Sequence, residues 1–553
     1  MRDTSRPRRR TAIVAGLVVT ALAGLALTAL HRTPRPAVPP RVAIHAALAN
    51  PGTAQALAGS HWNRVSASPL DGELERVDFW DSSQIQVGVA VDAHRQVVQE
   101  QNFSHEPVPY GDWLAYQPAL LIGLSILFLL VTVVLPWRRM RNLDALAALS
   151  FVLPVVLFQH RYLDPSLLAA GPGLLYLAAR CAWRGLGPAT EPAPSRPLLT
   201  ALARRPGGTG RIRWLRVTLG VVALIFVMIG VSSPLAVDVT YAVMEGATTL
   251  IHGALPYGHM PTGILHGDTY PILSYALYTP LAAVHPVRSE WDPVDGALAV
   301  AVAAALIAAW AAWRAAAGRR GRGRTTESEE AGLRAALAVL AFPAVMITAS
   351  TGTTDVVLAS MLGIVLLLWR RPAAAAATLA VAGWFKLAPF ALVPVLLASL
   401  RGRRLVGALG ALAAVSTVVL VLVVVVGGIH GPREMAHAVA YQFTRGSVQS
   451  MWSALGIEWA QPIAQAAVLG LIVAVTVRMW QEPGLAADEG RVAAVSASVL
   501  IGIQLAANYW AFLYLAWVVP LLSVSLLHPG LGARRRLARL PADTEILVPA
   551  LAA

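Results

Sequence analysis

Long apolar runs constrain this chain more than any other feature. A membrane-spanning helix needs about 20 predominantly apolar residues, and about 17 are tolerated. Of the 553 residues 56% are hydrophobic and only 13% are charged, where a soluble domain carries about 25% charged residues. We therefore predict an all-α polytopic membrane protein with about 14 spans. The fourteen runs lie at 11–30, 114–135, 143–158, 166–183, 215–233, 295–313, 333–349, 355–369, 373–386, 387–399, 405–426, 462–479, 491–507 and 511–527.

Arginine placement predicts how these spans are oriented. The chain has a net charge of +14, with 43 arginines and a single lysine, Lys386. Basic residues gather in cytoplasmic loops, and alternating the spans puts 33 of the 43 arginines on that side. We expect both termini in the cytoplasm and the protein in the cytoplasmic (inner) membrane of a bacterium. Because the basic charge then serves orientation, no nucleic-acid partner is expected, and the only cysteine, Cys181, excludes an internal disulfide.

The same topology requires that the apolar stretch Tyr270–Val284 does not cross the membrane. Amphipathic aromatic residues favour headgroup depth, and this part of the chain is rich in them. We expect them to lie along the outer interface. They are Tyr241, Tyr257, Tyr270, Tyr275, Tyr278 and Trp291.

Composition divides the chain into five parts. Alternation of polar and apolar residues in Leu74–Trp80 and Gln84–Val91 predicts two half-buried strands. The second part is therefore a small extracytoplasmic α+β or β module. The parts are an N-terminal membrane anchor (1–30), the extracytoplasmic module (31–113), additional spans with a cytoplasmic loop (114–210), a transmembrane core (211–530) with outer loops 234–294 and 427–461, and a cytoplasmic tail (531–553).

Ionisable residues at the outer ends of spans are the candidates for chemistry, because charge near a bilayer is costly. Asp238 follows one span, Lys386 joins two short apolar runs, and Arg445 lies in an outer loop. A carboxylate can take a proton from an alcohol, and Lys and Arg can hold a phosphate. Structural alternatives stay open: Asp238 can cap a helix, and Lys386 or Arg445 can anchor at headgroups.

Three histidines recur every seven residues in the outer loop. With Asp268, they present groups that could bind a divalent metal. Glycine and proline interrupt the segment, so one continuous helix cannot align the imidazoles. We therefore expect no metal, and a hydrogen-bonding role for one of the histidines is the alternative. The histidines are His252, His259 and His266.

Several segments in a fixed order resemble the GT-C superfamily of polyprenyl-phosphate-sugar glycosyltransferases. The resemblance covers roughly 211–530 and is strongest to glycosyltransferase family 87 and its mannosyl- and arabinofuranosyl-transferring relatives. Two positions depart from the usual motifs, Ile272 for a second proline and Gln449 for a glutamate. The segments are Asp238, Leu255-Pro256-Tyr257, Tyr270-Pro271-Ile272-Leu273, Thr354-Asp355, Phe385-Lys386-Leu387-Ala388-Pro389, Arg445-Gly446-Ser447-Val448-Gln449-Ser450 and Tyr514-Leu515-Ala516-Trp517-Val518-Val519-Pro520.

The resemblance implies a GT-C-like catalytic core that transfers a hexose or pentose from a polyprenyl-phosphate donor to a cell-envelope glycan or glycolipid. It implies that Asp238 is the general base and that Lys386 and Arg445 contact the donor phosphate. The partners are then the lipid-linked donor, the acceptor and membrane lipids, and no cofactor is expected beyond the donor substrate. Substrate contacts are expected from Glu245, Tyr257, His266, Asp268, Tyr270, Gln449 and Tyr514.

Two other functions fit parts of the sequence. A secondary transporter could use the short, proline-broken runs around Lys386 as discontinuous helices, although the ionisable groups are expected at outer ends and no internal repeat is visible. A non-catalytic sensor or scaffold could use residues 31–113 as a binding module.

Overall fold

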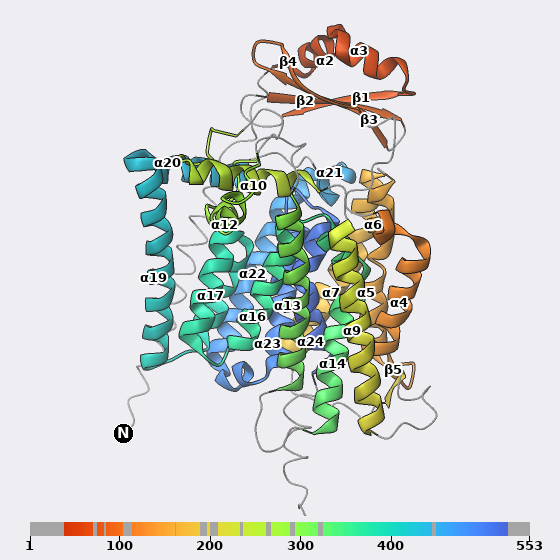
Figure 1. The fold of residues 1–553 in the computed structure, drawn as a ribbon, viewed down its shortest axis with the longest axis vertical. Coiled ribbons are helices and arrows are strands. Elements are labelled where there is room, and N and C mark those ends of the chain that lie inside the picture. The colour runs from red at the N-terminus through yellow and green to blue at the C-terminus, as the bar shows by residue number, and fades with distance from the viewer. Residues whose placement is uncertain are drawn as a thin grey trace, which may run out of the picture.

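The computed structural model is a helical bundle with a small sheet domain at one end (Figure 1). It describes residues 38–69, 74–81, 84–102, 113–160, 162–187, 196–198, 208–232, 236–260, 267–287, 294–318, 325–444 and 449–528. The predicted anchor 1–30 and the tail 531–553 lie outside these residues.

The sheet domain is an antiparallel meander covered by two helices. The strands pair in the order β1-β2-β3-β4, and the helices lie on the face that points away from the bundle (Figure 1). Both predicted strands are confirmed, and two helices, which the sequence analysis did not predict, make the domain α+β. The elements are α2 (Pro40–Ala49), α3 (Pro51–Ala58), β1 (Arg64–Pro69), β2 (Leu74–Asp81), β3 (Gln84–Asp92) and β4 (Val97–Asn102).

Alternation along β2 and β3 builds the core of this domain. Val77 and Phe79 point to one face of β2, and Val87 and Val89 do the same on β3, all at most 2% exposed. They pack with small alanines on α2. Proline fits the first turn of a helix, where its missing N–H is no loss, so α2 begins at Pro40.

Helices before residue 233 form one side of the bundle. Met140–Gln159 and Thr209–Gly230 are each long and apolar enough to cross a membrane. A two-stranded ribbon pairs β5 with β6 near one end. The elements are α4 (Pro118–Thr132), β5 (Val134–Leu135), α5 (Met140–Leu149), α6 (Val152–Gln159), α7 (Leu163–Leu186), β6 (Arg196–Pro197) and α9 (Gly208–Ser232).

The remaining helices form the core of the bundle. α14 and α15 bend by 55° where Pro343 starts a new helix, because proline cannot continue the hydrogen-bond ladder. The longer elements are α10 (Asp238–Ile251), α13 (Asp295–Ala317), α14 (Thr326–Leu340), α15 (Pro343–Ser350), α16 (Thr354–Leu368), α17 (Pro372–Phe385), α18 (Val393–Ala398), α19 (Gly402–Gly427), α20 (Gly431–Thr444), α22 (Gln461–Gln481), α23 (Glu489–Ala506) and α24 (Leu515–Leu527). The short helices are α11 (Leu273–Ala276), α12 (Thr279–Ala282) and α21 (Met451–Ala454), with 3₁₀ turns at Trp113–Tyr116, Ala388–Leu392, Gly428–His430, Glu458–Ala460, Pro483–Ala487 and Phe512–Tyr514.

The number of spans is confirmed only in part. Each run predicted after residue 113 falls on a helix or helix pair. Among the described residues, however, six helices are long and apolar enough to cross a membrane, or seven if the bent α14–α15 pair is one span. Runs such as 373–386 and 387–399 form helices shorter than a full crossing. Several apolar helices thus indicate a multi-pass membrane protein, and the count of fourteen stays a prediction.

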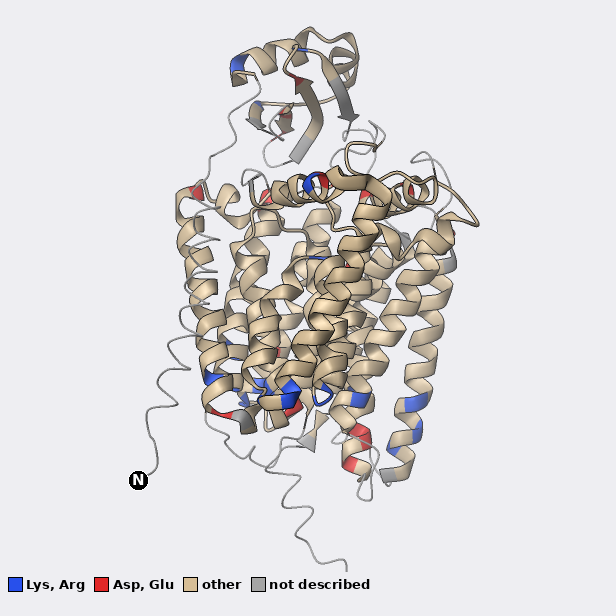
Figure 2. Cartoon of the chain, turned by 90° about the vertical axis from the view of Figure 1, so that its left-hand side faces the viewer, with Lys and Arg blue, Asp and Glu red and all other residues tan. Residues whose placement is uncertain are grey.

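Charge is distributed unevenly over the bundle. Arginines gather at the end opposite the sheet domain, whereas acidic residues are scattered at both ends (Figure 2). Most described arginines of the bundle therefore lie at one end, as the alternating topology requires. Which side of a membrane this end faces is still a prediction.

The segment 270–284 contains two helices of four residues each, α11 and α12, which are too short to cross a membrane. α10 and α12 lie at the sheet-domain end of the bundle (Figure 1). Three of the tyrosines are buried in protein, with Tyr257 4%, Tyr275 0% and Tyr278 1% exposed. These three rings therefore pack against protein, and two of their hydroxyls have carbonyl partners there: Tyr257 donates to Tyr270 and Tyr275 donates to Gly267. The depth of the segment in a membrane stays a prediction. Trp291 lies outside the described residues.

One long helix stands at the edge of the bundle. α19 packs mainly on α17, and the indole of Trp384 donates to the hydroxyl of Ser416 at 2.9 Å. Only Ala408, Val419 and Val423 of its 26 residues are buried. α20 continues from its upper end across the bundle (Figure 1).

Candidate active site

The start of α10 places Asp238. This helix begins at Asp238 itself. The N–H of Val237 donates to the carbonyl of Thr351 at 3.2 Å, and the hydroxyl of Thr240 donates to the same carbonyl at 2.9 Å. Two hydrogen bonds therefore fix the first turn of α10 against the loop between α15 and α16.

The Asp238 side chain is exposed and forms a local hydrogen bond. Its Oδ1 accepts the N–H of Val239 at 2.8 Å, while Val237 is the N-cap residue. Asp238 is thus the first residue of the helix and not its N-cap, although its side chain accepts an N–H of the first turn. Among the described residues, no lysine or arginine pairs with this carboxylate. Desolvation by the surrounding protein raises its pKa, and the negative charge of Asp355 raises the pKa further.

Asp355 is the centre of a buried polar cluster next to this turn. The hydroxyl of Thr353, two residues earlier, accepts the N–H of Asp355 at 2.9 Å and donates to its Oδ2 at 2.6 Å. Lys386 Nζ donates to Asp355 Oδ1 at 2.5 Å, and the indole N–H of Trp517 donates to the same oxygen at 2.6 Å. Asp355, Lys386 and Trp517 are 1%, 8% and 6% exposed, so this is a buried, hydrogen-bonded ion pair.

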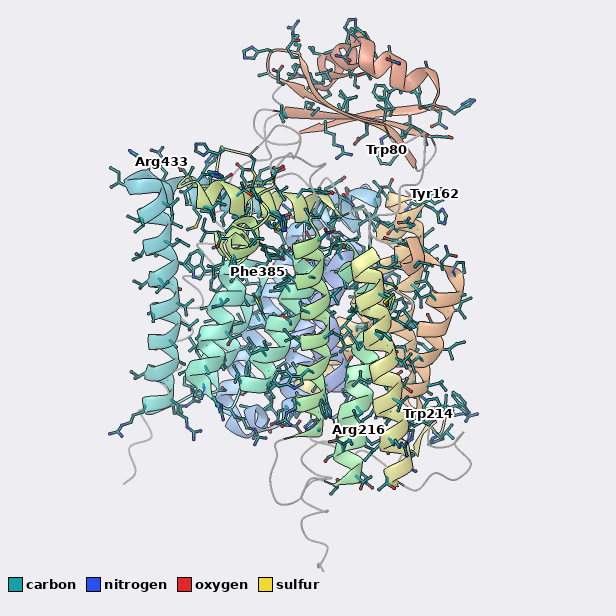
Figure 3. All side chains as sticks on the ribbon, in the orientation of Figure 1. Trp80, Tyr162, Trp214, Arg216, Phe385 and Arg433 are labelled. Atoms are coloured by element: carbon teal, nitrogen blue, oxygen red, sulfur yellow. The ribbon has the colours of Figure 1, made fainter. Side chains whose placement is uncertain are left out.

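Lys386 is positioned by the end of α17. The helix stops at Phe385, and Lys386 adopts an extended conformation. The hydroxyl of Ser274 on α11 donates to the carbonyl of Phe385, and Phe385 marks this position below α10 in Figure 3. This hydrogen bond joins the end of α17 to α11, which lies in the loop 234–294.

Aromatic rings surround the ammonium group of Lys386. Its Nζ lies 5.2 Å from the ring centroid of Tyr514, 5.3 Å from that of Trp517 and 6.0 Å from that of Tyr270. Tyr514 and Trp517 are stacked at 4.5 Å. A cation within about 6 Å of an aromatic centroid is stabilised by the ring quadrupole. The predicted residues Lys386, Tyr270 and Tyr514 are thus brought together.

Other predicted residues hold the outer loop in shape. Asp268 Oδ2 accepts the N–H of Gly258 at 3.0 Å, and Tyr257 donates to the carbonyl of Tyr270 at 3.2 Å. Glu245 is buried on α10, 3% exposed. The backbone of Gln449 accepts the N–H of Trp510 at 2.7 Å. These contacts account for the positions of Tyr257, Asp268 and Gln449, and contact of the four residues with a substrate stays a prediction.

Two predicted residues, His266 and Arg445, lie outside the described residues. His252 Nδ1 donates to the carbonyl of Thr248 at 2.7 Å, and His259 Nδ1 donates to that of Tyr257 at 2.9 Å. In each of these two imidazoles, one ring nitrogen is therefore occupied by a hydrogen bond to a nearby backbone carbonyl. Within the part of the chain that the structure describes, no three His, Cys, Asp or Glu side chains are grouped as metal ligands.

Asp355 and Trp517 are the residues that site prediction from the sequence missed. Both lie in segments that carried the family resemblance, but neither was assigned a role. The available signal was an aspartate at the start of an apolar run, since intramembrane acids are rarely without a partner. The partner, Lys386, is 31 positions away, a distance at which sequence spacing alone predicts no contact.

Comparison with known proteins identifies this region. Residues 269–522 match the profile of glycosyltransferase family 87. The matched segment contains Tyr270, Asp355, Lys386 and Tyr514 and begins after Asp238. No curated protein and no solved structure matched the chain. This match over residues 269–522 indicates that the chain is a glycosyltransferase.

Proposed function

We propose that the protein transfers a sugar from a polyprenyl-phosphate donor to a cell-envelope glycan or glycolipid on the extracytoplasmic side of the membrane. The observation that carries this proposal is that two carboxylates at one end of the bundle have different environments. Asp238 is exposed and has no cationic partner among the described residues, whereas Asp355 is buried and bound to Lys386.

The two carboxylates suit two different tasks. A general base must reach the acceptor hydroxyl and must be free to take its proton, and Asp238 meets both conditions. Asp355 has its oxygens occupied by Lys386, Trp517 and Thr353. It is therefore a positioning residue, which holds the ammonium group of Lys386 in place.

The proposed reaction is a single displacement with inversion. The acceptor oxygen attacks the anomeric carbon as its proton passes to Asp238, and the bond from that carbon to the phosphate oxygen breaks. The polyprenyl phosphate leaves with the bonding electrons. Lys386 and Arg445 are proposed to stabilise the negative charge on the phosphate, and the rings around Lys386 supply flat apolar surface for the sugar.

Replacement of the base tests this proposal. We expect Asp238→Asn to abolish transfer, because an amide cannot accept the proton, while the protein stays folded. Transfer would be measured with purified protein, labelled polyprenyl-phosphate sugars and envelope glycan acceptors. The matched control is Asp295→Asn, since Asp295 is also an exposed first residue of a helix. Retained transfer in Asp238→Asn would refute the assignment.

A further inference from the structure

A groove in the sheet domain has no role in the proposed reaction. It lies between α2, the start of α3 and the turn from β3 to β4, and its volume is about 650 Å³. Ligand pockets commonly measure about 300–1,000 Å³. Val42 and Ala46 on α2 contribute apolar surface, and Asn50 and Gln96 contribute amides. The groove therefore has the size and mixed lining of a ligand site.

The charged groups of this groove share one sign. Arg41 and His45 come from α2, and Arg95 comes from the β3–β4 turn. All three side chains are exposed, and the lining contains no aspartate or glutamate. Neither arginine has an ion-pair partner among the described residues. Two free guanidinium groups on one groove favour an anionic ligand, since arginine binds carboxylate and phosphate in a planar, bidentate manner.

Arg95 occupies a backbone conformation that an arginine rarely adopts. Its φ is +65°, and it is the one residue other than glycine with a positive φ in the described part of the chain. Asp92 holds the turn: its carbonyl accepts the N–H of Arg95 at 3.0 Å, and its carboxylate accepts the N–H of Gln96 at 2.7 Å. Glycine or asparagine normally takes this place in a hairpin turn. An unfavourable conformation kept at a ligand groove points to a functional requirement for the side chain.

The place of the groove limits what can occupy it. α2 and α3 cover the face of the sheet that points away from the bundle (Figure 1). Headgroups of the membrane that holds the bundle therefore do not face the groove. A saccharide fits the lining, because sugar rings stack on apolar surface, hydroxyls pair with amides and acidic substituents pair with arginine.

We infer that the sheet domain binds an acidic saccharide, a segment of glycan with carboxylate or phosphate groups, in the groove formed by Arg41, His45 and Arg95. This inference deepens the proposed function, because it rests on an extracytoplasmic sheet domain and gives the enzyme a second contact with envelope glycan.

Binding of a defined oligomer tests the inference. Full-length protein in nanodiscs of phosphatidylcholine would be titrated with labelled oligogalacturonate and with a neutral malto-oligosaccharide of equal length. We expect binding of the acidic oligomer only, and weaker binding as salt increases. Arg41→Gln and Arg95→Gln should each weaken binding about tenfold, the loss expected for one charged hydrogen bond. Arg433→Gln is the matched control, an exposed arginine on α20 at the same end of the molecule (Figure 3).

A second variant separates binding from folding. Arg95→Gly suits the positive φ, so we expect unchanged or higher thermal stability together with the same loss of binding as Arg95→Gln. Equal binding of the neutral oligomer, or complete displacement by an equal charge of inorganic phosphate, would overturn the inference. Binding needs no donor sugar and should persist in Asp238→Asn, so failure of the proposed transfer reaction would leave this result intact.

Discussion

At the scale of single residues, variants of the Asp355–Lys386 pair can separate its contribution to stability from its contribution to transfer activity. Removing one partner of a buried ion pair leaves an uncompensated charge and costs about 3–5 kcal/mol. We expect Lys386→Met to lower the thermal unfolding temperature, because the buried Asp355 then loses its ion-pair partner. Lys386→Met with Asp355→Asn should recover much of the loss, since a neutral amide can still accept the indole N–H of Trp517.

The same double variant should lack transfer activity. If the pair were only structural, recovered stability would bring recovered activity. Unfolding would be followed by thermal denaturation in nanodiscs, and activity by the labelled-donor assay. An unfolding temperature of Lys386→Met equal to that of the wild type would contradict the buried-pair interpretation.

Glu75 gives a pH-dependent prediction in the sheet domain. Burial raises its pKa to about 7, and its carboxylate oxygens have no hydrogen-bond partner among the described residues. In the unfolded chain the group ionises above about 4.5, so the domain loses stability as the pH rises from about 4.5 to about 7. Glu75→Gln should remove this loss.

Hydrogen exchange of the β2 and β3 amides in the full chain would measure this effect. The wild type should exchange faster at pH 8 than expected from chemistry alone, and Glu75→Gln should be better protected at that pH. Glu434→Gln, an exposed substitution on α20, serves as the control. Equal protection of wild type and Glu75→Gln at pH 8 would contradict a raised pKa of Glu75 in the folded domain.

At the scale of elements, α10 carries the proposed base, and the Thr240 hydroxyl anchors the first turn of this helix. Thr240→Val keeps the shape of the side chain and removes the hydrogen bond to Thr351, at a cost of about 1 kcal/mol. Because that bond fixes the first turn, we expect kcat to fall while KM changes little. Thr249→Val is the matched control, since the Thr249 hydroxyl bonds to Glu245 within the same helix.

Steady-state kinetics with a short-chain polyprenyl donor would separate kcat from KM. Equal kcat in Thr240→Val and Thr249→Val would show that the anchor to Thr351 does not position Asp238.

How far sequence predicts structure also differs from element to element. Strands β2 and β3 were predictable because alternation along one strand is a local pattern. α2 and α3 escaped prediction because their short, alanine-rich sequences have weak patterns and are stabilised by packing on the sheet. The buried tyrosines were misplaced because tyrosine suits both a membrane interface and a protein interior, and only tertiary hydrogen bonds decide between them.

Part of the candidate site could also be predicted from the sequence. Polar residues among apolar spans singled out Asp238 and Lys386 as candidates. The contact between Lys386 and Asp355 depends on how α16, α17 and α24 pack, which no local pattern encodes.

At the scale of the whole molecule, arginine placement predicts orientation. Cys181→Ala provides a background without cysteine. Because Cys181 is buried, the substitution removes no accessible thiol. Ala93→Cys lies in the exposed β3–β4 turn and Gly484→Cys in an exposed turn beside the arginine-rich end. We expect a membrane-impermeant maleimide to label Ala93→Cys in intact spheroplasts.

Gly484→Cys should react only after the membrane is opened. The opposite labelling pattern would place the sheet domain and Asp238 in the cytoplasm and would remove the basis of the proposed extracytoplasmic reaction.

The helix at the edge of the bundle exposes most of its surface beside the candidate site. The apolar run 405–426 of α19 is about 33 Å long at about 1.5 Å per residue, close to the roughly 30 Å of a bilayer interior. Only three of the 26 residues of α19 are buried, so we expect the surrounding lipid to influence the tilt of this helix. α20 follows its upper end, and Gln442 near the far end of α20 donates to the hydroxyl of Thr269 at 3.0 Å, one residue before Tyr270. We therefore expect transfer activity to depend on the acyl-chain length of the lipid.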